Sequence, residues 1–220
     1  LGHRPAGVSL EMKNAIEKGL LGSLPSIYEE RLVKAMRTLL PGYDVIGLFG
    51  SRESLVGRLV SLTGRFSGAV EIGDPALTPE SREGTHASLW RPFMKRETWP
   101  DLLVPVIPFP VGEAPWILCG RAGKFEAARE GGWPFTGTTS PILLAGACRA
   151  VYDLLGAKRE DPSEEEWGFL PRFGFRRKGV YLTFDGDRES HSVMVHAMME
   201  RGFRMCPVYP SVDIIPGEYS

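Results

Sequence analysis

Two amphipathic helical patterns flank a short apolar run in residues 26–64, and this order constrains the fold more than any other feature of the chain. Ser26 and Glu29 have the spacing of a capping box, which predicts a helix that begins at Ser26. Apolar residues then recur at the spacing of one helix face: Tyr28, Leu32, Met36 and Leu39. The helix is expected to end at Pro41 and Gly42, because proline cannot continue it.

A buried strand and a second helix are expected after this turn. Residues 43–49 form a short apolar run that contains Val and Ile, which is typical of a buried strand. Ser51 then begins a second helical pattern, and Gly64 ends it. The sequence therefore predicts a helix, a strand and a helix in succession, as in an α/β fold.

The middle of the chain contains three candidate strands. Residues 69–72 and 116–119 each form a short apolar run. Residues 102–107 are also apolar enough for a strand. Pro105 and Pro108 favour an edge strand or an irregular one there, because proline donates no hydrogen bond to a sheet.

Two helices are expected between these strands and the last third of the chain. The first follows residues 116–119 and ends at Glu130, before two glycines. The second covers residues 142–155 and is strongly apolar. Its expected buried side contains Leu143, Ala147, Ala150, Val151 and Leu154.

The last third of the chain has the pattern of a small α/β unit. Residues 163–166 form a second candidate capping box, and residues 180–184 alternate as a strand does. Asp187 is expected to cap a helix that Gly202 ends. The expected helix runs through Val193, Ala197 and Met198. Residues 203–208 predict the final strand.

Composition excludes several classes of protein. The 220 residues carry a formal net charge of -1, which gives no sign of nucleic-acid binding or of a polybasic membrane surface. No apolar run reaches the roughly 20 residues that span a bilayer, and the first residues lack the pattern of a signal peptide. Cys119, Cys148 and Cys206 lie far apart, which predicts reduced, buried thiols and a cytoplasmic location.

The motifs of several active sites are missing. His191 and His196 lie five positions apart, which does not place two metal ligands on one helix face. The sequence contains no G-x-S-x-G, so Ser-His-Asp chemistry has no support. Its glycines form neither a G-x-G-x-x-G nor a Walker loop. We therefore expect no metal site.

Residues 100–121 begin with Pro-Asp, end with Gly-Arg and contain a proline-rich apolar stretch. They resemble one segment of the class III aminotransferases, a fold-type-I family that includes glutamate-1-semialdehyde aminomutase. In that family the segment contains the lysine that holds pyridoxal phosphate as a Schiff base. The resemblance places Ile107 at the lysine position. Because isoleucine has no amine, it cannot form an imine or move a proton.

Other segments resemble the same family in the same order. Residues 1–3, Leu-Gly-His, are similar to a motif near its N-terminus, and residues 24–49 to its first large-domain helix and strand. Residues 134–155 and 179–215 resemble a threonine-containing loop with its helix and the C-terminal small domain. The resemblance implies an α/β fold with a shortened large domain at residues 1–156 and a small C-terminal α/β domain at residues 157–220.

The chain also departs from the family. Only residues 65–99 fill a stretch that in the family holds several central strands, a ring-stacking aromatic and the aspartate that pairs with the pyridinium nitrogen. Asp74 and Asp101 are candidates for that aspartate, but neither lies in a matching Asp-Glu motif. The nearest lysines, Lys95 and Lys124, have the sequence context of surface charges.

Four residues are candidates for binding a cofactor phosphate. Ser51 and Arg52 lie where the family has its phosphate cup, and the helix N-terminus there offers free N–H groups. Glu53 instead brings a like charge beside any phosphate. Thr136 and Thr138 lie in a loop that in the family reaches a phosphate across a dimer interface. The alternatives are an ordinary N-cap at Ser51, a solvated Arg52 and threonine hydroxyls in a turn.

These observations favour a degenerate aminotransferase-like protein that acts through binding or assembly, without lysine-dependent transamination. The alternative is an enzyme of the aminotransferase or aminomutase class that binds pyridoxal phosphate non-covalently or through a displaced lysine. A third hypothesis, an unrelated active site, requires Arg52, Glu53, Asp101 and Glu113 to lie together. No cofactor is expected, and pyridoxal phosphate is the one that the resemblance leaves open. A homodimer or a complex with another subunit is expected to cover exposed sheet edges and helix faces.

Overall fold

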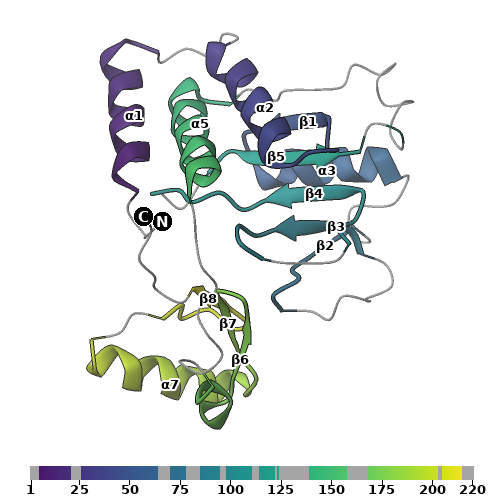
Figure 1. Cartoon of the computed structure of the whole chain (residues 1–220). Coiled ribbons are helices and arrows are strands. Elements are labelled where there is room, and N and C mark those ends of the chain that lie inside the picture. The colour runs from purple at the N-terminus through teal and green to yellow at the C-terminus, as the bar shows by residue number, and fades with distance from the viewer. Residues whose placement is uncertain are drawn as a thin grey trace. The chain divides into compact units, whose positions relative to one another are not determined.

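The computed structural model describes residues 5–20, 26–63, 70–77, 85–94, 98–110, 114–121, 123, 139–157, 168–202 and 205–214. The chain divides into two compact units, both drawn in Figure 1. The N-terminal unit contains Leu1–Gly73, Glu83–Pro92 and Thr98–Ala157, and the C-terminal unit contains Asp74–Arg82, Phe93–Glu97 and Lys158–Ser220. The domain boundary between residues 156 and 157 stays a prediction. The C-terminal unit includes two earlier segments of the chain as well as its end.

Five strands form the sheet of the N-terminal unit, in the order β1-β5-β4-β3-β2. They are β1 (Val45–Phe49), β2 (Glu71–Gly73), β3 (Thr85–Trp90), β4 (Leu102–Pro105) and β5 (Trp116–Gly120). The strand β5 is antiparallel to both β1 and β4, whereas β2, β3 and β4 are parallel to one another. The carboxyl ends of β1, β2, β3 and β4 therefore lie at the same edge of the sheet. This mixed α/β sheet agrees with the predicted fold class.

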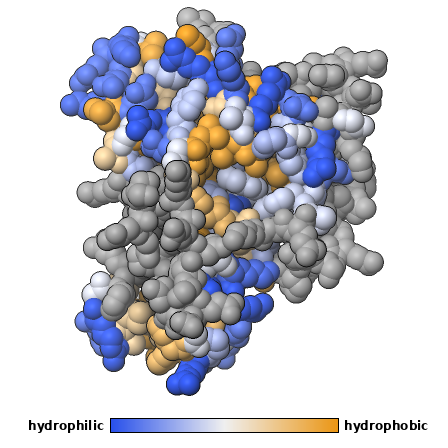
Figure 2. Space-filling view, in the orientation of Figure 1, coloured by the Kyte–Doolittle hydropathy of each residue, from blue (hydrophilic) through white to orange (hydrophobic). Residues whose placement is uncertain are grey.

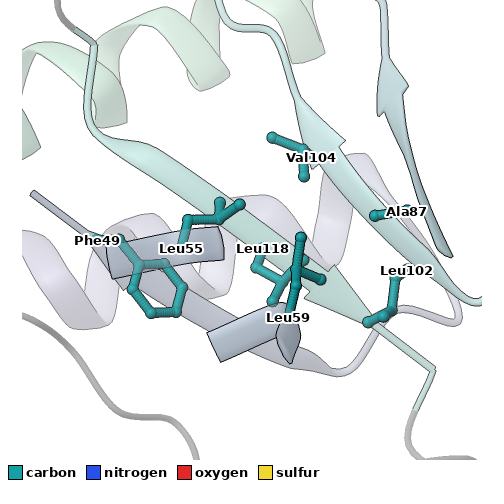
Figure 3. Close-up of a cluster of buried hydrophobic side chains, with 7 residues drawn as sticks. All are labelled: Phe49, Leu55, Leu59, Ala87, Leu102, Val104 and Leu118. Atoms are coloured by element: carbon teal, nitrogen blue, oxygen red, sulfur yellow. The ribbon is translucent and has the colours of Figure 1, made fainter. Parts of the chain in front are cut away.

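The helix α3 (Arg52–Thr63) covers one face of this sheet. Its side chains Leu55 and Leu59 pack with strand residues in a single apolar cluster, shown in Figure 3. The buried members of the cluster are Phe49, Leu55, Leu59, Ala87, Leu102, Val104 and Leu118. The alternate strand residues are also buried on the opposite face: Ile46, Leu48, Leu103, Ile117 and Cys119.

Helices α2 (Ile27–Leu39) and α5 (Pro141–Gly156) lie over the second face, and α5 also contacts α1 (Ala6–Glu17) (Figure 1). As predicted, Ser26 caps α2. Its Oγ accepts the N–H of Tyr28 at 3.3 Å, whereas a capping box would use the N–H of Glu29. The predicted helix at residues 142–155 is confirmed as α5. Its Gly146 packs so closely that a Cβ there would lie 2.8 Å from Met12 Cγ.

The predictions for β4 need a correction. We expected an edge strand or an irregular one, but β4 lies in the middle of the sheet between β3 and β5. Pro105 is its last residue, so the missing N–H interrupts no ladder within the strand. The next residue, Val106, donates its N–H to the Trp90 carbonyl at 2.8 Å, so pairing with β3 resumes at once.

In the described part of the C-terminal unit, a three-stranded antiparallel sheet is joined by the helix α7 (Arg188–Glu200) and a short 3-10 helix. The strands β6 (Phe175–Lys178), β7 (Tyr181–Phe184) and β8 (Val212–Ile214) lie in that order, after the short 3-10 helix Leu170–Phe173. Helix α7 begins, as predicted, at Asp187, whose carboxylate accepts the Ser190 N–H at 2.8 Å. This hydrogen bond lowers the pKa of Asp187, as expected for a carboxylate at a helix N-terminus.

Two features of this unit differ from the sequence predictions. The final strand is β8, and the described part of residues 203–208 is not a strand. There the Cys206 N–H donates to the Asp213 carboxylate at 2.9 Å instead of to a neighbouring strand. The strand β6 was not predicted, because three of its four residues are basic.

The α3 face of the sheet allows a direct test of the core. Leu118→Ala should lower the free energy of unfolding by about 2–5 kcal/mol, because it leaves a cavity in the cluster of Figure 3. The measurement is urea unfolding followed by circular dichroism. Leu10→Ala is the control, because Leu10 is 58% exposed on α1, and its effect should stay within about 0.5 kcal/mol. Equal losses for the two variants would contradict the assigned core.

Candidate functional site

The carboxyl ends of the parallel strands form the candidate site, because open α/β sheets bind ligands at that edge. The chain leaves β1 through Ser51 into α3, and it leaves β4 through Ile107. The strands β1 and β4 both run antiparallel to β5, so these two exits share an edge of the sheet. Sequence resemblance had assigned a cofactor role to these same two positions.

Ser51 caps helix α3. Its Oγ accepts the backbone N–H of Ser54 at 3.2 Å and lies 3.2 Å from the Ser54 hydroxyl. The hydroxyl is therefore already engaged within the first turn of the helix. A role in phosphate binding stays a prediction, and it would require Ser51 to exchange one of these contacts.

A carboxylate also lies at this helix N-terminus. The pKa of Glu53 is lowered, first by a hydrogen bond with its own backbone N–H and then by one with the Ser51 hydroxyl. Glu53 and Arg52 are both exposed in the first turn of α3. An incoming anion would meet an ionised carboxylate that already uses part of the positive end of the helix.

Ile107 is a buried aliphatic residue at the exit of β4. Its side chain is 6% exposed, and the preceding residue is fixed by the hydrogen bond from the Val106 N–H to Trp90. Isoleucine offers neither a nucleophile nor a proton-transfer group at this position. The other assigned residues, Thr136 and Thr138, lie outside the described residues, as do Lys95, Lys124 and Glu113.

The two candidate aspartates have other roles in the structure. Asp74 Oδ1 accepts the Ala76 N–H at 3.0 Å in the turn that follows β2. Asp101 precedes β4, at the opposite end of that strand from Ile107, and its Oδ1 lies 3.9 Å from Arg121 Nε. Arg121 also donates to the Tyr43 hydroxyl at 3.3 Å, which is the main reason that its pKa is raised. The residues of the third hypothesis are thus not brought together, since Arg52 lies at the carboxyl edge and Asp101 at the amino edge.

His191, which was considered from the sequence only as a metal ligand, is a buried residue of the C-terminal unit. His191 is 1% exposed, and its Nε2 lies 3.3 Å from the Ser211 Oγ. The rings of Phe184 and Tyr209 lie beside it, with centroids 5.8 and 5.5 Å away. These contacts are those of a packed, hydrogen-bonded core residue. The described residues contain no group of His, Cys, Asp and Glu side chains that could hold a metal ion.

At the exit of β4, Ile107 supplies no amine that could hold pyridoxal phosphate covalently. Glu53 is an exposed carboxylate in the first turn of α3, and its pKa is lowered. The residues that favour the cofactor are Ser51 and Arg52, through the N-terminus of α3.

Comparisons with solved structures identify the fold. The chain is similar to an omega-transaminase from Sphaerobacter thermophilus, with a TM-score of 0.58 and 11% identity over 96% of this chain and 78% of that one. It is also similar to serine palmitoyltransferase from S. paucimobilis, with a TM-score of 0.53 and 14% identity over 91% of this chain and 76% of that one. The fold is that of the fold-type-I pyridoxal-phosphate-dependent transferases. No protein-family model matches the chain, and no curated protein matches its sequence.

The structural similarity establishes the fold, and identities this low leave the chemistry to the residues of the site. A further serine palmitoyltransferase structure matches with a TM-score of 0.57 and 15% identity over 93% of this chain and 79% of that one. No helix in the described ranges is long and apolar enough to cross a membrane.

The three thiols differ enough in environment to be distinguished chemically. Burial raises the pKa of Cys119 and raises that of Cys148 to about 12, whereas Cys206 is half-buried. Because the thiolate is the reactive form, Cys206 should react first with a thiol reagent at pH 8. Peptide mass mapping after brief labelling of the native protein measures this order. Cys206→Ser should remove the fast phase, and rapid labelling of Cys119 or Cys148 would contradict the assigned burial.

Proposed function

We propose that this protein is a degenerate aminotransferase-like protein that acts through binding or assembly, without lysine-dependent transamination. The observation that carries the proposal is Ile107, a 6% exposed aliphatic residue at the exit of β4. The resemblance to class III aminotransferases assigns the Schiff-base lysine to this position. An aliphatic side chain there removes the group on which the reaction depends.

The first turn of α3 supports the same proposal. The Ser51 Oγ accepts an N–H of the helix N-terminus, where a cofactor phosphate would otherwise bind, and Glu53 adds a carboxylate to the same turn. A carboxylate at this position repels a phosphate and competes for the same N–H groups. The lysine position and the phosphate position have thus both lost the chemistry that the cofactor needs.

Exposed apolar side chains support a role in assembly. Ile16, Ile27 and Tyr152 are 51%, 58% and 49% exposed in the N-terminal unit. Val193 and Val208 are 67% and 65% exposed in the C-terminal unit. Figure 2 shows hydrophobic residues at the surface of both units beside hydrophilic ones. A second copy or another subunit is the partner that we propose to cover them.

A cofactor titration tests the proposal. Purified protein is mixed with pyridoxal phosphate, reduced with borohydride and mapped by mass spectrometry. We expect no stoichiometric adduct on any single lysine, because the position after β4 has no amine. Ile107→Lys is the reporter variant, and Ile107→Leu is its aliphatic control. A stoichiometric adduct on one lysine of the unchanged protein would overturn the proposal and identify a displaced base.

The second candidate function is an enzyme of the aminotransferase or aminomutase class that holds pyridoxal phosphate without Ile107. The observation in its favour is the capped N-terminus of α3 with Arg52 beside it, directly after β1. Under this function, Arg52→Ala should raise the Kd of the cofactor about tenfold, because one charge-assisted hydrogen bond is lost. Calorimetry measures this Kd. Glu53→Gln should lower the Kd, because the like charge is removed. Arg172→Ala, at an exposed arginine of the C-terminal unit, is the control. Absence of binding in all four proteins would reject this function.

A further inference from the structure

Part of the core of the C-terminal unit comes from much earlier in the chain. Val180 and Tyr181 are 1% and 3% exposed, and they pack against Ala76 from the loop that leaves β2. Phe93 and Met94, from the loop that leaves β3, pack against the same cluster. The C-terminal unit is therefore completed by two loops that begin where parallel strands of the first sheet end.

These loops cover the face of the small sheet that α7 leaves open. Phe184 of β7 contacts Phe175 and His191, with ring centroids 5.4 and 5.8 Å apart, so its face of the sheet packs on α7. Tyr181 lies three positions earlier in the same strand, so its side chain points to the opposite face. That face is buried by Ala76, Phe93 and Met94. Without the loops, Val180 and Tyr181 would be exposed to water.

Polar contacts hold the first loop in place. Lys178 at the end of β6 donates from Nζ to the Pro75 carbonyl at 2.8 Å. The loop is shaped by Asp74, whose carboxylate accepts the Ala76 N–H at 3.0 Å and whose carbonyl accepts the Leu77 N–H at 3.0 Å. The turn after β2 therefore presents a fixed surface to the hairpin of β6 and β7.

The second loop has an unfavourable backbone. Phe93 has φ 63°, and among the described residues it is the only non-glycine residue with a positive φ. A bulky side chain in this left-handed region is a genuine outlier, which persists only where surrounding contacts compensate for it. Its carbonyl faces the tight turn between β6 and β7, where a Cβ on Gly179 would lie 3.5 Å from the Phe93 oxygen. The compensating contacts are those that its ring and Met94 make with Ala76, Val180 and Tyr181.

We propose that Phe93 and Met94 form a strained latch that keeps the C-terminal unit folded. The left-handed backbone at Phe93 is tolerated only while its ring packs in the cluster, so withdrawal of the loop relaxes the strain and exposes the hairpin core. The loops that complete this cluster begin after β2 and β3. This inference does not depend on the proposed function.

Hydrogen exchange of the unaltered protein, followed by NMR, gives the first test. The amides of Ala76 and Leu77 should share the opening free energy of the β7 amides, Tyr181–Phe184, because they belong to one cooperative unit. This opening free energy should differ from that of the amides of β4 and β5. Exchange of Ala76 and Leu77 in step with β4 and β5, and independently of β7, would overturn the proposal.

Three variants separate the ring from the backbone strain. Phe93→Ala removes the ring and keeps the left-handed backbone, so the β7 amides should exchange at least about tenfold faster than in the unaltered protein, with β4 and β5 unchanged. Phe93→Gly also removes the ring, and of the two replacements only alanine keeps the penalty of the left-handed backbone. The β7 amides should therefore exchange about fivefold faster in Phe93→Ala than in Phe93→Gly. Phe173→Ala is the control, because Phe173 is 57% exposed in the same unit, and it should leave β7 unchanged.

Each departure from this pattern has a definite meaning. Wild-type or slower exchange of β7 in Phe93→Ala, which keeps the backbone penalty, would show that the ring stabilises nothing, and the latch would be rejected. Equal exchange in the glycine and alanine variants would reject the strain. A loss in Phe173→Ala as large as in Phe93→Ala would show that any aromatic truncation destabilises the unit. If either Phe93 variant does not fold, Lys178→Met, which removes only the contact with Pro75, should accelerate exchange in β6 and β7 alone.

Discussion

Burial of β5 on both faces is the constraint on which the N-terminal unit depends. Ile117 and Leu118 are adjacent, both are fully buried, and they point to opposite sides of the sheet. One helix layer must therefore cover each side, and α3 and the pair α2 and α5 meet this requirement. Because β5 runs against β1 and β4, it also fixes the direction of both neighbours. The shared carboxyl edge, and with it the candidate site, is a consequence of this pairing.

The elements with strong local signals were predicted correctly from the sequence. Ser26 and Asp187 carry the side-chain oxygen atoms that begin α2 and α7, and such caps depend on a few neighbouring residues. The position of β4 in the sheet depends instead on two strands far away in sequence, and Pro105 gave the wrong expectation because it lies at the strand end. The final strand was also misplaced, because its position depends on a distant segment of the chain: β8 pairs with β7.

The candidate site could be predicted only in part. Resemblance located Ser51 and Ile107, and the topology then brings their positions to one edge of the sheet. The sequence could not show that Asp101 lies at the other end of β4 from Ile107, because that requires the strand boundaries. The burial of His191 could not be predicted from the sequence either, because it depends on contacts with Tyr209 and Ser211, which follow the end of α7. The apolar Val193 on the same helix is instead exposed.

The strand ends of this sheet lead into different surroundings. An amine at position 107 would be desolvated by its surroundings, which favours the neutral form that a nucleophile needs. At the exit of β1 the helix N-terminus is occupied by Ser51 and Glu53, and at the exits of β2 and β3 the loops are packed in the core of another unit. Each of these contacts stabilises the fold locally, at the edge where open α/β sheets bind ligands.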